Sequence, residues 1–178
     1  MWSAISSINI GDTLQARTLS FAALISVLSI ATASIARADN IYLKVPGLTG
    51  PVTQAPYAGI IEILSYSQGF ANVGGASPPQ CSDTAIMKNI DIASSFFARS
   101  VLDQSTAPFI ATLYFVNSTT FVASPTINMN GVTVNSVQHS ASEGGGPITE
   151  SISMHATSLT VTFTDANGAK KTYTASCP

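Results

Sequence analysis

The sequence has little charge and few of the residue types that usually carry chemistry. Only 9% of its 178 residues are charged, and seven Lys or Arg stand against nine Asp or Glu. It contains two cysteines, two histidines and one tryptophan. No basic cluster exists beyond Lys170 and Lys171, so the chain cannot neutralise many phosphates, which argues against nucleic acid as a partner.

Metal and cofactor motifs are also missing. Two cysteines and two distant histidines, His139 and His155, do not have the spacing of zinc ligands. The glycine-rich segment 143–147 lacks the lysine and the following helix of a phosphate-binding loop, and is better explained as a mobile loop. We therefore expect neither a metal nor a cofactor.

Catalytic candidates are weak. His139 and His155 could each serve as the base for a nearby serine, but no Gly-x-Ser-x-Gly elbow is present, and solvated surface histidines are the favoured interpretation. Glu143 and Glu150 flank the glycine-rich segment, yet a flexible loop fixes no carboxylate separation for a glycosidase pair. The sequence therefore favours a protein that is not an enzyme.

The first forty residues carry an export pattern. Arg17 precedes an apolar run over residues 19–30, which is too short for a permanent anchor, and Ala36-Arg37-Ala38 fits an A-x-A cleavage site. The pattern predicts a secretory signal peptide over residues 1–38 and a working domain over residues 39–178.

Other interpretations of this segment remain open. It could form a buried N-terminal helix, cleavage could follow Ala33, or translation could start downstream of Met1. No second apolar stretch of spanning length follows, so we expect no membrane insertion of the mature chain. We expect the mature protein to be periplasmic or secreted.

Both cysteines fall in the predicted mature domain. An exported protein meets oxidising conditions, so a Cys81–Cys177 disulfide is the default expectation, with two free thiols as the alternative. Closing so long a loop would stabilise the fold by roughly 4–5 kcal/mol in the chain-entropy account.

Strand-like alternation dominates the mature chain. Ile41–Val45 alternates, residues 59–67 read as one strand, and residues 109–116 are apolar on both faces, as expected for a central covered strand. The convincing helix is Ser94–Gln104, which Ser94 or Ser95 is placed to cap.

Two breaks in alternation indicate bent strands. The apolar face changes parity between residues 152–156 and 159–163, and again at Asn130-Gly131. Such bulges bend a sheet toward closure as a barrel. Ala166–Ala169 contains Asn-Gly and predicts a type I′ hairpin turn.

Two surface features have alternative explanations. Asn117-Ser118-Thr119 fits an N-glycosylation sequon and otherwise marks a turn. The aromatic residues Tyr57, Tyr66, Phe70 and Tyr114 could form a sugar-stacking patch, although at strand spacing they are more often core or interface residues.

Four segments share their pattern with a known family. They are Ile41–Val45, Ile61–Gly69, the strand-to-helix junction Lys88–Ser94, and Gly146–Met154 with its Glu-Ser-aliphatic-Ser-aliphatic strand. Together they resemble the type VI secretion tube protein, the hemolysin-coregulated protein family, over residues 41 to about 174. The Gly146–Met154 strand is the most specific of the four.

The resemblance implies a mainly β fold, a two-sheet closed β-barrel with one flanking helix, assembled as a hexameric ring. Rings of that family stack into a tube that can carry effectors, so the implied partners are further copies of the chain and secretion-system spike or effector proteins. The loop Gly69–Gln80 is implied to contact the next ring, and its candidate stacking residues are Phe70, Asn72, Gly74, Gly75, Pro78 and Pro79.

One feature departs from that family. Its tube proteins ordinarily lack a cleavable leader, whereas this chain carries the export pattern. A secreted monomeric β-barrel for binding or adhesion is therefore the second hypothesis, and a secreted hydrolase is the third.

Overall fold

The computed structural model describes residues 40–71, 80–103 and 106–177. The predicted signal peptide and the residues 72–79 of the predicted stacking loop lie outside them. The elements of the described part are β1 (Asn40–Lys44), β2 (Ile61–Ile63), β3 (Ser65–Ser67), β4 (Phe70–Ala71), β5 (Gln80–Cys81), β6 (Thr84–Asn89), α1 (Ser94–Leu102), β7 (Phe109–Val116), β8 (Ala123–Ser140), β9 (Thr149–His155), β10 (Ser158–Thr164) and β11 (Lys170–Ser176).

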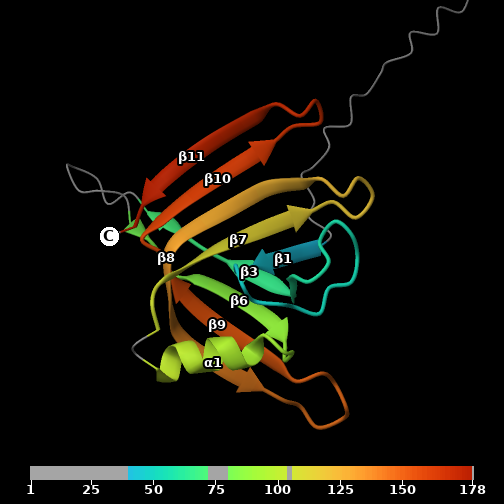
Figure 1. Cartoon of the computed structure of the whole chain (residues 1–178), viewed down its shortest axis with the longest axis vertical. Coiled ribbons are helices and arrows are strands. Elements are labelled where there is room, and N and C mark those ends of the chain that lie inside the picture. The colour runs from blue at the N-terminus through green and yellow to red at the C-terminus, as the bar shows by residue number, and fades with distance from the viewer. Residues whose placement is uncertain (1–39, 72–79, 104–105, 178) are drawn as a thin grey trace, which may run out of the picture. The chain divides into compact units, whose positions relative to one another are not determined.

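Two antiparallel sheets share the long strand β8 (Figure 1). The first half of β8 pairs with β7 on one side and β10 on the other, and β1, β2 and β11 extend that sheet outward. The second half of β8 pairs with β9, followed by β6 and β3. The mainly β fold with one helix is confirmed.

The bend in β8 lies where the sequence predicts it. Gly131 has a positive φ of 58°, and a Cβ at this position would collide with the side chain of Thr157. Thr157 itself lies between β9 and β10, where the paired chain also changes sheets, and its backbone N–H donates to the Asn130 carbonyl. Both parity breaks therefore occur at one corner, since two paired strands must bend together.

The predicted strand over residues 59–67 is wrong as a single element. It divides at Leu64 into β2, which pairs with β1, and β3, which pairs with β6. The Leu64 backbone N–H donates to the Met87 carbonyl, so the chain passes from the edge of one sheet to the edge of the other within one residue.

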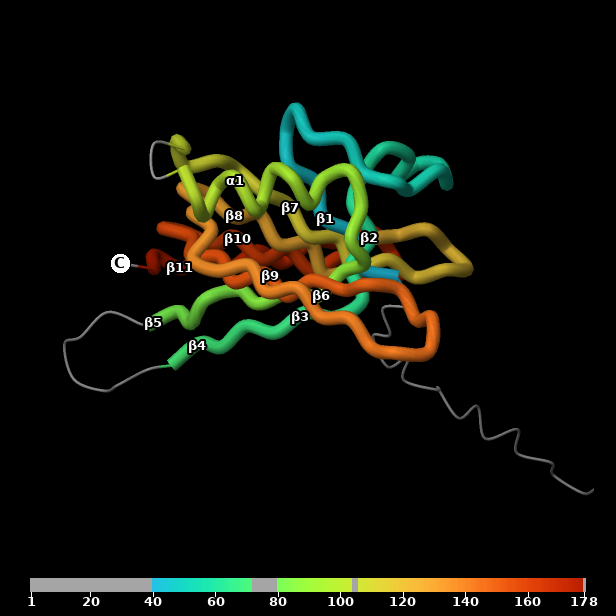
Figure 2. Tube along the Cα trace, turned by 90° about the horizontal axis from the view of Figure 1, so that it is seen from below, coloured from blue at the N-terminus to red at the C-terminus, as the bar shows by residue number. Residues whose placement is uncertain are grey.

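The core lies between the two sheets and under the helix. Its buried hydrophobic side chains come from strands of both sheets and from α1. The largest of those that are fully buried are Phe97, Leu43, Ile61, Ile86, Leu113, Met129, Ile152, Met154 and Leu159. Figure 2 shows α1 running along one side of the strands. A separate aromatic cluster joins Tyr57, in the loop between β1 and β2, to Tyr42 and Tyr114.

The helix begins at Ser94 as predicted, but the predicted cap is wrong. Ala93 is the N-cap residue and makes no side-chain cap hydrogen bond. The Ser94 hydroxyl instead lies inside a buried ion-pair network, where it donates to Glu150. Phe97 is fully buried, and the ring of Phe96 contacts both Phe97 and Phe109 edge-on.

The turn between β10 and β11 also differs from the prediction. Only Gly168 has a positive φ, 82°, so Asn167 does not take the conformation that a type I′ turn requires. Asp165 Oδ1 accepts hydrogen bonds from the backbone N–H groups of Asn167 and Ala169. This side chain stabilises a turn with a single left-handed residue at Gly168, the pattern of a three-residue hairpin loop.

Among the described residues, no helix has the length and hydrophobicity that a membrane crossing requires.

Candidate functional site

A buried ion pair joins the strand β6 to the strand β9. Lys88 Nζ lies 2.7 Å from Glu150 Oε1, and both side chains are completely buried. The two residues are direct partners in the β6–β9 register, so the sheet itself brings them together. A charge removed from water this completely needs a paired countercharge and further hydrogen bonds.

The entrance to α1 supplies those further bonds. Lys88 Nζ also donates to Ser94 Oγ at 3.1 Å and to the Asn89 carbonyl at 2.8 Å, and lies 2.9 Å from Asp91 Oδ1. Ser94 donates to Glu150 Oε1 at 2.6 Å and accepts from the Asp91 backbone N–H. The network therefore fixes where the helix leaves the strand.

The second oxygen of Glu150 is less well satisfied. Glu150 Oε2 lies 3.3 Å from His139 Nε2, but it has no hydrogen-bond partner among the described residues. His139 is half exposed at the end of β8. His139 is therefore partly exposed to solvent, as predicted, but it also contacts the buried Glu150, which the sequence did not indicate.

The second histidine belongs to a different polar cluster. His155 Nδ1 lies 3.4 Å from Asp83 Oδ1, while Asn135 and Ser153 donate to Asp83 Oδ2. Burial raises the pKa of Asp83, but hydrogen bonds from Asn135, Ser153 and His155 and the electrostatic effect of His155 outweigh it, so that the pKa is lowered. The Ser153 hydroxyl donates to the carboxylate rather than to the histidine, so the cluster is not arranged to activate a serine.

The structure does not bring the other catalytic candidates together. His139 is opposite Glu150 in the β8–β9 register, whereas His155 is opposite Thr133 at the far end of the same pair. Glu143 is exposed, whereas Glu150 is buried with Lys88, so they do not form a glycosidase pair.

The aromatic candidates also separate. Tyr57 and Tyr114 have ring centroids 5.6 Å apart, but Tyr66 packs against Phe115, and its burial raises the pKa of Tyr66 to about 12. Phe70 is more than half exposed.

Asn117, the first residue of the sequon, lies in a turn, where its side-chain oxygen accepts hydrogen bonds from the backbone N–H groups of residues 119 and 120.

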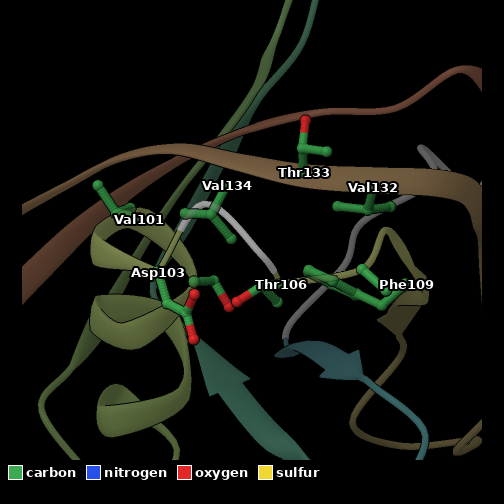
Figure 3. Close-up of a pocket in the computed structure, with 9 residues that line it drawn as sticks. Val101, Asp103, Thr106, Phe109, Val132, Thr133 and Val134 are labelled. Carbon is green, nitrogen blue, oxygen red and sulfur yellow. The ribbon is translucent and has the colours of Figure 1, made fainter.

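A small pocket of about 240 Å³ lies where α1 approaches β8 (Figure 3). Val101, Phe109, Val132 and Val134 supply most of its apolar surface. Asp103 is the only charged side chain among the described residues that line it, and Arg99 lies 3.8 Å from it. The pocket therefore presents no pair of groups for acid and base chemistry.

An apolar groove of about 340 Å³ lies along the β10–β11 hairpin. Its walls are Leu159, Val161 and Phe163 on β10, Tyr173 and Ala175 on β11, and Phe70 on β4. Of the candidate stacking residues, Phe70 alone is described, and Asn72, Gly74, Gly75, Pro78 and Pro79 lie outside the described part.

The predicted disulfide is present next to the strands that form this groove. Cys81 on β5 is bonded to Cys177, with Cα atoms 5.3 Å apart, and Cys177 is almost completely buried. Phe70 is the register partner of Cys81, so the bond ties the wall formed by β4 to the end of β11.

Fold and site together define a mainly β protein in which buried charges anchor the single helix to the sheets. Residues 42–164 match the family described as "Type VI secretion system effector, Hcp". The chain therefore belongs to the Hcp family of the type VI secretion system. No curated protein sequence matches it significantly.

Solved structures of Hcp proteins and of a type VI secretion system effector have the same fold. A type VI secretion system effector from Yersinia pestis superposes with a TM-score of 0.67 at 17% identity, covering 76% of this chain and 98% of the other. Hcp1 from Salmonella typhimurium gives 0.66 at 16% identity, covering 77% and 93%. The secreted protein Hcp3 from Pseudomonas aeruginosa gives 0.61 at 10% identity, covering 78% and 98%.

Sequence reasoning missed the pairing of Lys88 with Glu150. A signal was available in the alternation of the two strands. Lys88 falls on the same face as Ile86, and Glu150 on the same face as Ile152, so each strand carries one charge at a core position. Opposite charges at core positions of two strands indicate that the strands pair with each other.

Proposed function

We propose that this chain is a structural subunit that forms closed rings, and that the rings stack into a tube. The single observation that carries the proposal is the family match over residues 42–164. The fold supports it, because the chain covers 98% and 93% of the Yersinia and Salmonella structures and so contains nearly all of each subunit fold.

The two sheets are proposed to close into a barrel. Leu64 joins β2 at the edge of one sheet to β3 at the edge of the other, and β8 crosses between the sheets at the opposite side. These two crossings support a closed circuit of strands with α1 on its flank.

Six copies in each ring and ring-to-ring contact through the loop Gly69–Gln80 are the finer parts of the proposal. The exposed Phe70 at the base of that loop supports a role in contact between copies. The proposed partners are other copies of the chain, together with secretion-system spike or effector proteins.

Such a subunit needs no catalytic site, cofactor or metal. In the described part, His139 and His155 lie in separate clusters, and Glu150 is bonded to a lysine rather than facing a second free carboxylate. These placements support a structural role over the hydrolase hypothesis.

Export before assembly is also proposed. Cleavage near Ala38 would release residues 39–178 into an oxidising compartment, and the Cys81–Cys177 bond supports this because such bonds persist mainly there. Sequencing the N-terminus of the secreted protein tests it. A mature chain that starts at Asp39 is expected, and an uncleaved chain that begins with Met1 would contradict it.

The mass of the purified protein in solution tests the ring directly. Native mass spectrometry should give about six times the mass of one processed chain, and electron microscopy should show annular particles. A persistent monomer at micromolar concentration would refute the ring and favour the secreted monomeric module for binding or adhesion.

A further inference from the structure

The apolar face of the β10–β11 hairpin loses its cover toward the turn. Leu159 at the start of β10 is 1% exposed, Val161 is half-buried, and Phe163 is 45% exposed. Tyr173 on β11, 62% exposed, is the register partner of Val161, and its ring centroid lies 6.1 Å from that of Phe163. The core face of the sheet thus continues past the residues that cover it.

The opposite face of the hairpin is polar. Thr160 lies 3.3 Å from Thr174 and Thr162 lies 3.2 Å from Thr172, measured between hydroxyl oxygens. The hairpin therefore has one polar and one apolar face, and Phe163 and Tyr173 on the apolar face stay largely exposed although Phe70 forms a wall of the same groove. A strand pair with one polar face and one largely exposed apolar face is typical of a surface that becomes buried when proteins associate.

A second exposed apolar surface, here called the isoleucine ridge, consists of Ile90, Ile92 and Ile148. The Ile90 backbone N–H donates to the Ile148 carbonyl, which places the two residues side by side, and Ile92 follows at the helix entrance. Their exposed fractions are 41%, 74% and 50%. Because Lys88 and Glu150 anchor this junction from inside, the ridge is held on a rigid base.

The β10–β11 hairpin, which carries most of the groove, and the junction between β6 and α1, which carries Ile90 and Ile92, are different parts of the fold. In Figure 1 the β10–β11 hairpin forms the upper side, and α1 with the loop between β8 and β9 forms the lower side. A ring built from identical subunits requires two different surfaces on each subunit, one meeting the other on the next copy. The apolar groove and the exposed isoleucine ridge are two different apolar surfaces and so satisfy that requirement.

Charge supports the same pairing. Lys170 and Lys171 begin β11 beside the hairpin turn, and Glu143 lies in the loop between β8 and β9. All three are exposed and make no ion pair within the described part of the chain. Both segments lie on the right in Figure 1, so stacking one upper side on the next lower side brings the lysines toward the glutamate.

We propose that the β10–β11 groove binds the isoleucine ridge of a second copy of this chain, and that this contact joins neighbouring subunits. The proposal rests on the proposed ring function and names the surfaces that make its lateral interface. Phe163 and Tyr173 bury their rings against Ile92 of the neighbour, and Lys170 and Lys171 meet Glu143 at the rim.

The test uses protein expressed from the full-length sequence and measures mass by native mass spectrometry. Ile92→Asp disables the ridge and Tyr173→Asp disables the groove, and each variant alone should be monomeric. Their 1:1 mixture should form a heterodimer and stop there, because one chain keeps a groove and the other keeps a ridge. Leu102→Asp, at the other end of α1 and 84% exposed, is the matched control and should assemble as the original chain does.

The rim charges give an independent readout. Changing both Lys170 and Lys171 to Glu should slow assembly at least tenfold at low salt, and adding Glu143→Lys should restore most of the rate. Circular dichroism verifies the folding of each variant, and Ile148→Asp and Phe163→Asp replace any variant that misfolds.

The outcomes separate the two proposals. If the ridge and groove variants both assemble like the original chain, the contact proposed here is wrong while the ring stands. If each variant is monomeric but the mixture forms no heterodimer, the groove and ridge do not bind each other and the inference is overturned. A monomeric original chain would refute the contact and the ring together.

Discussion

The two sides of this fold differ in what they bury: one side buries charged side chains, and the other leaves aromatic side chains exposed. Around α1, the charges of Lys88 and Glu150 are completely buried and bonded to each other. At the β10–β11 hairpin, the rings of Phe163 and Tyr173 remain exposed. One side hides charge and the other displays apolar surface, and both arrangements are costly in an isolated subunit unless something compensates them.

The compensation differs between the two sides. The ion pair is satisfied within the subunit, by Ser94, Asp91 and the Asn89 carbonyl. At the hairpin, Phe163 and Tyr173 stay largely exposed, and the Cys81–Cys177 bond ties the end of β11 to β5. The α1 side is therefore satisfied within the monomer, whereas the proposed contact with another copy would cover the hairpin side.

Breaking the ion pair should give the largest effect. Lys88→Met leaves the Glu150 carboxylate buried without its countercharge, and we expect the free energy of unfolding to fall by about 3–5 kcal/mol. Urea denaturation measures this free energy of unfolding. The control is Lys44→Met, at an exposed position, which should change the free energy of unfolding by less than about 0.5 kcal/mol.

The double variant Lys88→Met with Glu150→Leu sharpens the same point. Because both charges are removed, it should recover most of the stability that the single variant loses. If the single variant lost less than about 1 kcal/mol, the network would not be the anchor described here.

Removing the disulfide tests the hairpin side. Replacing Cys81 and Cys177 together with Ser should lower the free energy of unfolding by about 2–5 kcal/mol, chiefly by freeing the unfolded chain, because the bond closes a loop of 96 residues. Chemical denaturation measures the change. Thiol titration of the original chain in denaturant should find no free thiol, and two free thiols would contradict the bond.

Acid should produce a smaller effect through Asp83. Its folded pKa lies below the ordinary value of 3.8, so its stabilisation is present above that value and is lost as the pH falls through the folded pKa. Asp83→Asn should therefore lose less stability than the original chain between pH 5 and pH 3, as followed by thermal melting. Equal losses of stability in the two proteins would show that Asp83 does not contribute to the destabilisation in acid.

The smallest effect is expected on the open face of the hairpin. In the monomeric Ile92→Asp background, Tyr173→Thr should change the free energy of unfolding by no more than about 0.5 kcal/mol, since its ring is largely exposed in one subunit. In the same background, Phe97→Ala should cost about 3–5 kcal/mol because Phe97 is fully buried. A loss of more than 1 kcal/mol for Tyr173→Thr would show that the ring already packs within the monomer.

Much of the fold could be predicted from the sequence, because period-two alternation and its breaks depend on local pattern alone. The bends near Gly131 and Thr157 followed from parity changes, and the disulfide followed from two cysteines in a chain whose sequence predicts export. The division of residues 59–67 at Leu64 could not be predicted, since both halves show the same alternation and only pairing partners distinguish them.

Long-range pairing limited what the sequence showed of the site. Ser94 has the right type and position for a helix cap, but its hydroxyl donates its hydrogen bond to Glu150, 56 residues later. The turn at Asn167-Gly168 was mispredicted because the side chain of Asp165 stabilises a different loop. The groove is formed by residues of β4, β10 and β11, so no single segment of the sequence could predict it.

Hydrogen exchange tests the contrast between the two sides most directly. The account predicts that β6 and β9 are strongly protected both in the assembled original chain and in the monomeric Ile92→Asp variant, whereas protection of β10 and β11 rises on assembly. Equal exchange of the β10–β11 hairpin in the two samples would contradict the claim that a second copy covers it.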